Sequence, residues 1–126
     1  MICRLAEGAR VDAARQELAN VLREARSFLA LPGNNFDWSS WGDAAAALAE
    51  VDGLIAVLEA GRLPSRLTVS VLFAPTGPIQ EVSLSSGWAD EFLALASRCD
   101  TAVEAAYNSP WWRRLLNRPF GEGERT

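Results

Sequence analysis

The stretch "LTVSVLFAPTGPIQEVSLS", residues 67–85, decides the fold class that this sequence predicts. Residues 67–73 alternate between apolar and polar side chains and are rich in β-branched residues, and residues 79–85 repeat this pattern more weakly. The intervening "APTGP" contains two prolines and a glycine, which favour a turn. The stretch therefore predicts a two-stranded antiparallel β-hairpin. Its common apolar face would consist of Leu67, Val69, Val71, Phe73, Val82 and Leu84.

Helical periodicity lies on both sides of this hairpin. Apolar residues recur every three or four positions over residues 11–29, 41–60 and 88–106, while charged residues fill the other positions. A further short helix is expected over residues 110–118, because Pro110 suits a first helical position. A two-stranded hairpin is marginally stable by itself, so helices must cover its apolar face. The predicted fold is α+β and mostly helical, in the order helix, helix, β-hairpin, helix and short C-terminal helix.

The helix predicted over residues 41–60 is expected to be central to the fold. Ser40 and Asp43 have the spacing of a capping box, in which both side chains bind backbone N–H groups at the start of a helix. One face of this helix is apolar, and the opposite face carries small residues that include Gly53 and Ala56. Because small residues let another backbone approach closely, we expect a second helix to pack on that face.

The chain has the length and composition of one globular domain. It contains 126 residues, of which 49% are hydrophobic and 22% are charged, as is usual for folded proteins. We therefore predict a single domain over residues 1–120 and a frayed tail over residues 121–126. The two cysteines, Cys3 and Cys99, form no disulfide framework or zinc-binding pattern, and Cys99 falls on a core-facing helical position.

The charged residues argue against several kinds of function. All twelve basic residues are arginine, histidine is absent, and the net charge is -4. Nucleic-acid binding is disfavoured, because it needs a basic face. A chain without lysine or histidine lacks the residues for Schiff-base and P-loop chemistry and the commonest general base and metal ligand. We therefore expect no cofactor, no resident metal and no enzymatic activity.

The N-terminal sequence and the residue usage bear on location and origin. No apolar stretch near the N-terminus is long enough for a signal peptide or a membrane span, so the expected protein is cytoplasmic and does not enter a membrane. Arginine as the sole basic residue, together with many alanines, is typical of a GC-rich bacterial coding sequence.

The stretch "NNFDWSSWGD", residues 34–43, is the first candidate site. Trp41 is predicted to be buried, because it projects with the apolar face of the helix that follows. Trp38 and Asp37 precede that helix in a loop, where no helical period directs them inward, and they are predicted to face a partner.

Asp43 and Glu50 are predicted to extend this surface along the helix. Residues 33–61 contain five acidic residues and no basic residue. The simpler interpretation is a solvated acidic face, and the functional one is attraction of a basic site on a partner. Two carboxylates would hold a divalent ion only with a third ligand such as Asp90.

The second candidate is a docking patch in "WWRRLL", residues 111–116, where aromatic and cationic residues follow one another. The alternative is a short helix that packs back on the core. The candidate docking residues are Trp111, Trp112, Arg113 and Arg114.

These observations favour a small non-enzymatic protein-interaction domain. Its partner would be another protein with a basic site, as for an inhibitor or immunity-type protein. The alternative is a carboxylate-based metal-dependent hydrolase or a small-ligand-binding domain that uses Asp43, Glu50 and Asp90. Tight binding of a divalent ion would distinguish the second hypothesis from the first.

Overall fold

The computed structural model describes residues 2–107, with side chains from Gly8 onward, and this part of the chain forms five helices and no strand. The helices are α1 (Ile2–Leu29), α2 (Ala44–Glu59), α3 (Arg66–Leu72), α4 (Pro78–Ser86) and α5 (Ala89–Tyr107).

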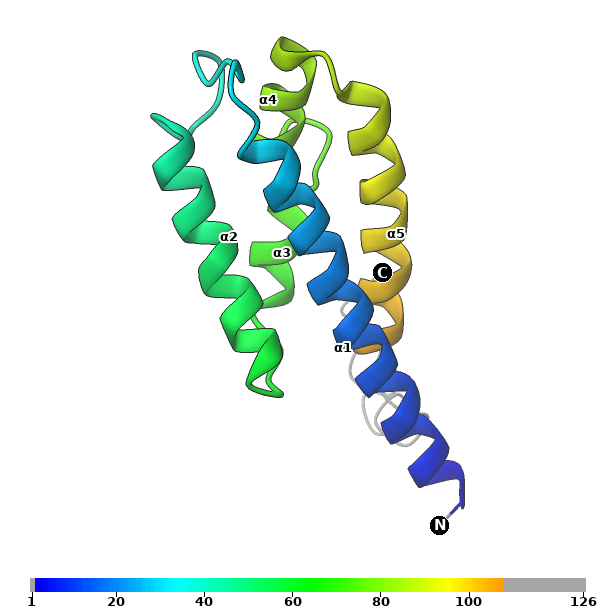
Figure 1. Cartoon of the computed structure of the whole chain (residues 1–126). Helices are drawn as coiled ribbons and strands as arrows, with labels where there is room; N and C mark the ends of the chain where they lie inside the picture. The colour runs from blue at the N-terminus through cyan, green and yellow to red at the C-terminus, as the bar shows by residue number, and fades with distance from the viewer. Residues whose placement is uncertain (1, 108–126) are drawn as a thin grey trace, which may run out of the picture.

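The helices are arranged as an up-down-up-down bundle (Figure 1). α1 packs against α2 on one side and against α5 on the other, and both of these helices run opposite to it. The two short helices α3 and α4 follow one another and together return in the direction of α1. The third rod of the bundle is therefore broken, at residues 73–77.

The β-hairpin predicted for residues 67–85, and with it the α+β fold class, is wrong, because these residues form α3, a turn and α4. Their buried positions are three and four residues apart, which is the helical period and not the alternation of a strand. Two strands would have left a marginal hairpin, whereas the two helices bury their apolar side chains against the long helices of the bundle. The buried residues are Val69, Leu72, Phe73, Ile79, Val82 and Ser83.

The turn between α3 and α4 uses the residues that suggested a hairpin turn. Gly77 is the N-cap residue of α4, and Pro78 occupies its first turn, where no backbone N–H donor is needed. The backbone N–H of Gly77 donates to the carbonyl of Ala74 at 2.9 Å. Gly77 is buried so tightly that an added Cβ would lie 2.3 Å from the backbone oxygen of Val71.

The inward stripes predicted for the two long amphipathic helices are confirmed. α1 begins at Ile2, however, so it includes Gly8 and extends well before the Val11 that was expected to start it. The buried stripe of α1 contains Ala14, Leu18, Val21, Leu22, Ala25 and Leu29. That of α5 contains Phe92, Leu95, Cys99, Val103 and Ala106.

Two expectations for α2 are wrong. The helix begins after Asp43, whose Oδ1 accepts a hydrogen bond from the N–H of Ala46 at 2.9 Å, and Ser40 lies before it instead of capping it. Gly53 and Ala56 are exposed, and a Cβ added at Gly53 would meet nothing within 4 Å. The small-residue face of α2 therefore carries no second helix from the described part of the chain.

Because Gly53 is exposed, adding a side chain there should raise the stability of the protein, whereas close packing would make the same change lower it. Gly53→Ala adds a methyl group in open space and lowers the backbone entropy of the unfolded chain, so the free energy of unfolding should rise by about 0.5–1 kcal/mol. Urea unfolding followed by circular dichroism measures this. A loss of stability would show that the face is covered after all.

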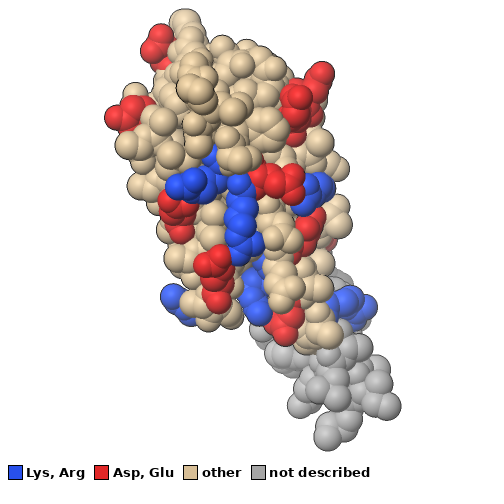
Figure 2. Space-filling view, in the orientation of Figure 1, with Lys and Arg blue, Asp and Glu red and all other residues tan. Residues whose placement is uncertain are grey.

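Exposed ion pairs join α1 to both of its long neighbours. On the face of the molecule that Figure 2 shows, arginines lie along the middle and carboxylates lie on either side. Such exposed pairs contribute little stability individually. Towards α2 the pairs are Arg23 with Glu59 and Arg26 with Asp52; towards α5, Arg98 pairs with Glu17 and Glu24.

The Arg26–Asp52 pair predicts part of the pH dependence of stability. Hydrogen bonds from Arg26 lower the pKa of Asp52 from its ordinary value of 3.8. A carboxylate whose pKa is lowered on folding stabilises the folded protein at pH values above its ordinary pKa of 3.8. This stabilisation is lost as the pH falls through the folded-state pKa. Asp52→Asn should therefore reduce the drop in the urea midpoint between neutral pH and about pH 3. An unchanged drop would show that the pair contributes nothing.

Candidate partner-binding site

The loop between α1 and α2 is held in place by Asn34. Its Nδ2 donates to the carbonyls of Phe28 and Leu29 at 2.7 and 3.0 Å, so it binds the last turn of α1. Its Oδ1 accepts a hydrogen bond from Nε1 of Trp88 at 3.0 Å, and the Trp88 ring stacks on Phe28. The start of this loop is thus fixed to both α1 and the segment that leads into α5.

The two tryptophans of the loop have opposite environments, as the sequence predicted. Trp41 is 6% exposed and belongs to the core, whereas Trp38 is 74% exposed. Trp41 precedes α2, and its buried indole Nε1 donates a hydrogen bond to Oε1 of Glu50 at 3.0 Å. Its backbone N–H also donates to Oγ of Ser39 at 3.2 Å. Trp41 therefore has a structural role, and Trp38 is accessible to a partner.

The three predicted acidic residues are exposed, but each has a different role in the structure. Asp37 is exposed in the loop, where its backbone N–H donates to Oδ1 of Asn35 at 2.8 Å. Asp43 is occupied as the cap of α2, and Glu50 holds the indole of Trp41. Of the four predicted partner-binding residues, Glu50 lines a cavity to which Asp37, Trp38 and Asp43 do not contribute.

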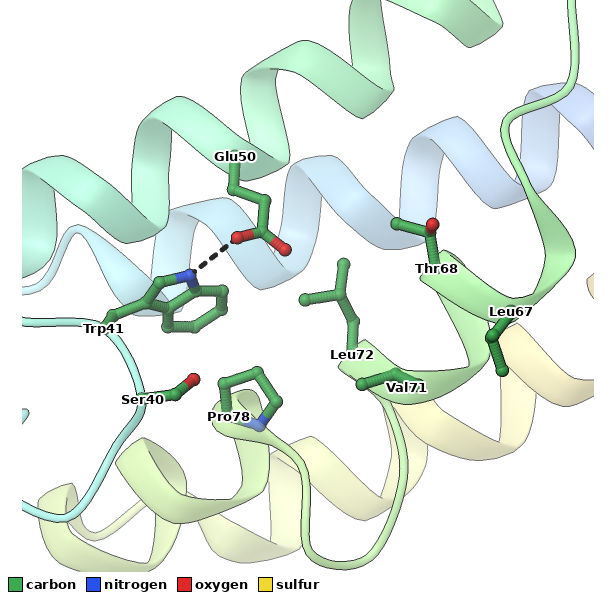
Figure 3. Close-up of a pocket in the computed structure, with 8 residues that line it drawn as sticks. All are labelled: Ser40, Trp41, Glu50, Leu67, Thr68, Val71, Leu72 and Pro78. Carbon is green, nitrogen blue, oxygen red and sulfur yellow. Dashed lines mark hydrogen bonds between the residues drawn. The ribbon is translucent and has the colours of Figure 1, made fainter.

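That cavity is a groove of about 480 Å³ between α2 and α3 (Figure 3). The loop contributes Ser40 and Trp41 to it, and the start of α4 contributes Pro78. Glu50 is the only ionisable residue among those that line it. The lining residues are Ser40, Trp41, Glu50, Leu67, Thr68, Val71, Leu72 and Pro78.

Exposed apolar residues of α3 form one side of the groove. Leu67 is 72% exposed and Val71 is 50% exposed, and both lie four residues apart on one helix face. The sequence prediction missed this surface because it placed both residues on the buried face of a strand. A helical interpretation of residues 66–72 would have found it, since Val69, Leu72 and Phe73 fill the inward positions and leave Leu67 and Val71 outside.

A second groove, of about 400 Å³, lies between α1 and α5. Four alanines line it, and the charged residues that line it include Glu17 and Arg98. These two residues pair with each other at 2.9 Å, so their charges are already matched within the protein. This groove therefore offers a partner less unmatched charge than the one that Glu50 lines.

The hydrolase alternative gains no support from the geometry. No three acidic or cysteine side chains of the described residues lie together as metal ligands, so Asp43, Glu50 and Asp90 form no metal site. The thiol of Cys99 is buried, and burial, followed by the charge of Asp100, raises its pKa to about 12. It is not activated as a nucleophile.

Several predictions lie outside the described residues. These are the short helix over residues 110–118, the docking candidates Trp111, Trp112, Arg113 and Arg114, and the tail over residues 121–126; the side chain of Cys3 is also not described. None of the described helices is both long and apolar enough to cross a membrane. The cytoplasmic location and bacterial origin stay predictions from the sequence.

No protein family matches the chain, and no curated protein or solved structure matches it significantly.

Proposed function

We propose that this chain is a non-enzymatic protein-interaction domain that binds another protein through the groove between α2 and α3. The loop that carries Trp38 forms one end of this surface, because Ser40 and Trp41 of the same loop line the groove. The observation that carries the proposal is the exposure of large apolar side chains at a groove: Leu67 and Val71 on α3.

The exposed apolar side chains of this surface suit an interaction site. Exposed apolar groups beside a concave, partly buried floor mark interaction sites more often than scattered single residues do. Leu72 and Trp41 provide the buried floor, and the exposed Trp38 offers a large rigid ring at low entropic cost. Burying these groups against a partner would supply the main favourable term in binding.

The charge of the surface favours a basic partner. The loop and α2 contribute Asp37, Asp43 and Glu50, and residues 33–61 contain no arginine to neutralise them. Electrostatic complementarity of this kind mainly increases the association rate and the selectivity for the partner. A partner with apolar side chains next to arginine or lysine therefore fits best.

Selection from a library of random peptides displayed on phage tests this function. Peptides enriched on the wild-type protein should bind at least about tenfold more weakly to Leu67→Asp, since a charge would have to be buried at the contact. Leu93→Asp is the matched control, because Leu93 is 58% exposed on α5 and away from the groove. Failure to enrich any peptide, or enriched peptides that bind Leu67→Asp as tightly as Leu93→Asp, would refute the proposal.

A further inference from the structure

We propose that the groove binds an amphipathic helix of the partner, with an arginine or lysine beside its apolar stripe that pairs with Glu50. This inference rests on the proposed function and specifies the conformation and the charge of the bound segment. Three features of the groove support it: its helical walls, the separation of α2 from α3, and the position of the Glu50 carboxylate.

The helical walls favour a helix as the bound segment. A chain that is buried in an extended conformation needs backbone partners, which a strand edge supplies in other binding modes. The groove is built from helices, a loop and a proline, and the described residues contain no strand that could pair with a ligand. A helix satisfies its own backbone groups, so it loses none of these hydrogen bonds when its apolar face is buried.

The separation of α2 from α3 leaves room at the seam between them. Within the described part of the chain, α2 packs on α1, whereas α3 packs on α4 and α5. A bound helix at this seam would contact α2 and α3 together, as a core helix contacts two neighbours. Leu67 and Val71 form an i, i+4 ridge, which is the surface feature that packs into the groove of another helix.

The position of Glu50 favours a cationic residue on the bound helix. The other two acidic residues of α2, Asp52 and Glu59, pair with arginines of α1. Residues 52 and 59 project about 180–200° away from residue 50 around the helix, so Glu50 points to the other side. One oxygen of Glu50 accepts the bond from Trp41, and Figure 3 shows the second oxygen turned towards the space between Leu72 and Thr68.

Two display libraries test the conformation of the bound segment. In one, random residues occupy positions i, i+3, i+4 and i+7 of an alanine-rich helical host and the positions that flank this stripe; in the other, a host with regularly spaced prolines prevents helix formation. The inference predicts enrichment from the helical library alone, with arginine or lysine next to the apolar positions. The inference would be overturned if peptides were enriched from the proline library, or if the selected helical peptides carried no basic residue. Either result would leave the groove as a peptide-binding site. If neither library yields a binder, the proposed function fails as well.

A double-mutant cycle tests the ion pair. Replacing the basic residue of the best helical peptide by glutamine should weaken binding to the wild-type protein about two- to fivefold, as for a partly exposed pair. Glu50→Gln keeps an acceptor for Trp41 but removes the charge, so the same peptide change should then have no effect. A preference for the basic peptide that persists in Glu50→Gln would overturn the pairing.

Sedimentation velocity tests the competing occupant, a second copy of this chain. The inference predicts that the protein without peptide is monomeric at the concentrations used for binding. A dimer that is lost in Leu67→Asp but retained in Leu93→Asp would assign the groove to self-association and overturn the inference.

Discussion

Gly77→Ala should destabilise the protein by about 3 kcal/mol or more, which would leave little of the stability that is typical of a small domain. The new Cβ would lie 2.3 Å from the backbone oxygen of Val71 and 3.1 Å from those of Leu72 and Ala74. These neighbours are backbone atoms of α3 and its turn, so they cannot move aside as a flexible side chain could. The substitution would have to push α3 away from α4 or unwind one of them.

The free energy of unfolding in urea, followed by circular dichroism, measures this effect. Gly42→Ala is the matched control, because a Cβ at Gly42 meets nothing within 4 Å, and its effect should stay within about 0.5 kcal/mol. Equal stability of the two variants would show that the turn between α3 and α4 does not pack as described.

Trp41→Ala should cost about 3–5 kcal/mol, as the truncation of large buried aromatic residues does. The indole is 6% exposed, packs in the core and donates to Glu50 at 3.0 Å. Its removal would leave a cavity at the end of the groove and release the carboxylate that the indole holds. Trp41→Phe should recover part of the loss, since it restores apolar packing without the hydrogen bond.

Trp38→Ala is the control for this substitution. Trp38 lies in the same loop and is 74% exposed, so its truncation should change stability by no more than about 0.5 kcal/mol. Circular dichroism is the suitable probe, because both changes alter tryptophan fluorescence. If the two alanine variants lose equal stability, the loop is sealed by both aromatic rings, and Trp38 is not a partner contact.

The sequence was sufficient to predict the long helices, because each has a long apolar stripe with one period. The stripes of α1 and α5 repeat over several turns, and no competing period fits them. The opposite environments of Trp38 and Trp41 were also predicted, although the stated reason for Trp41 was wrong. It lies in the loop before α2, not on the helix itself, and its indole packs in the core and donates to Glu50.

The strand prediction for residues 67–85 was wrong because the spacing of apolar residues in a short segment can fit both a strand and a helix. Over seven residues, Leu67, Val69, Val71 and Phe73 fit a strand, while Val69, Leu72 and Phe73 fit a helix equally well. Tertiary packing selected the helix, since α3 and α4 together form the third rod of the bundle and pack on α5, and α4 also packs on α1. The helix signals were local and present: Pro78 after Gly77, Glu81 in the first turn and Gly87 at the end.

The candidate site was predicted in part for the same reason. The acidic and aromatic residues could be recognised from their types and from the missing helical period around Trp38. The groove itself depends on α3, and a strand assignment hides it by turning Leu67 and Val71 inward. Glu50 was singled out for its charge, but its contact with Trp41 depends on how the loop folds back on α2, which no local pattern specifies.

The tryptophan indole signals in a ¹H–¹⁵N correlation spectrum test most directly whether the groove between α2 and α3 is the binding site. A peptide selected on the wild-type protein is added to it, and the signals are assigned with Trp41→Phe, Trp38→Phe and Trp88→Phe. The indole N–H of Trp41 lies at the groove, whereas that of Trp88 donates to Asn34 beside α1. We predict that the Trp41 signal shifts on binding and that the Trp88 signal does not. A shift of the Trp88 signal with an unmoved Trp41 signal would contradict it.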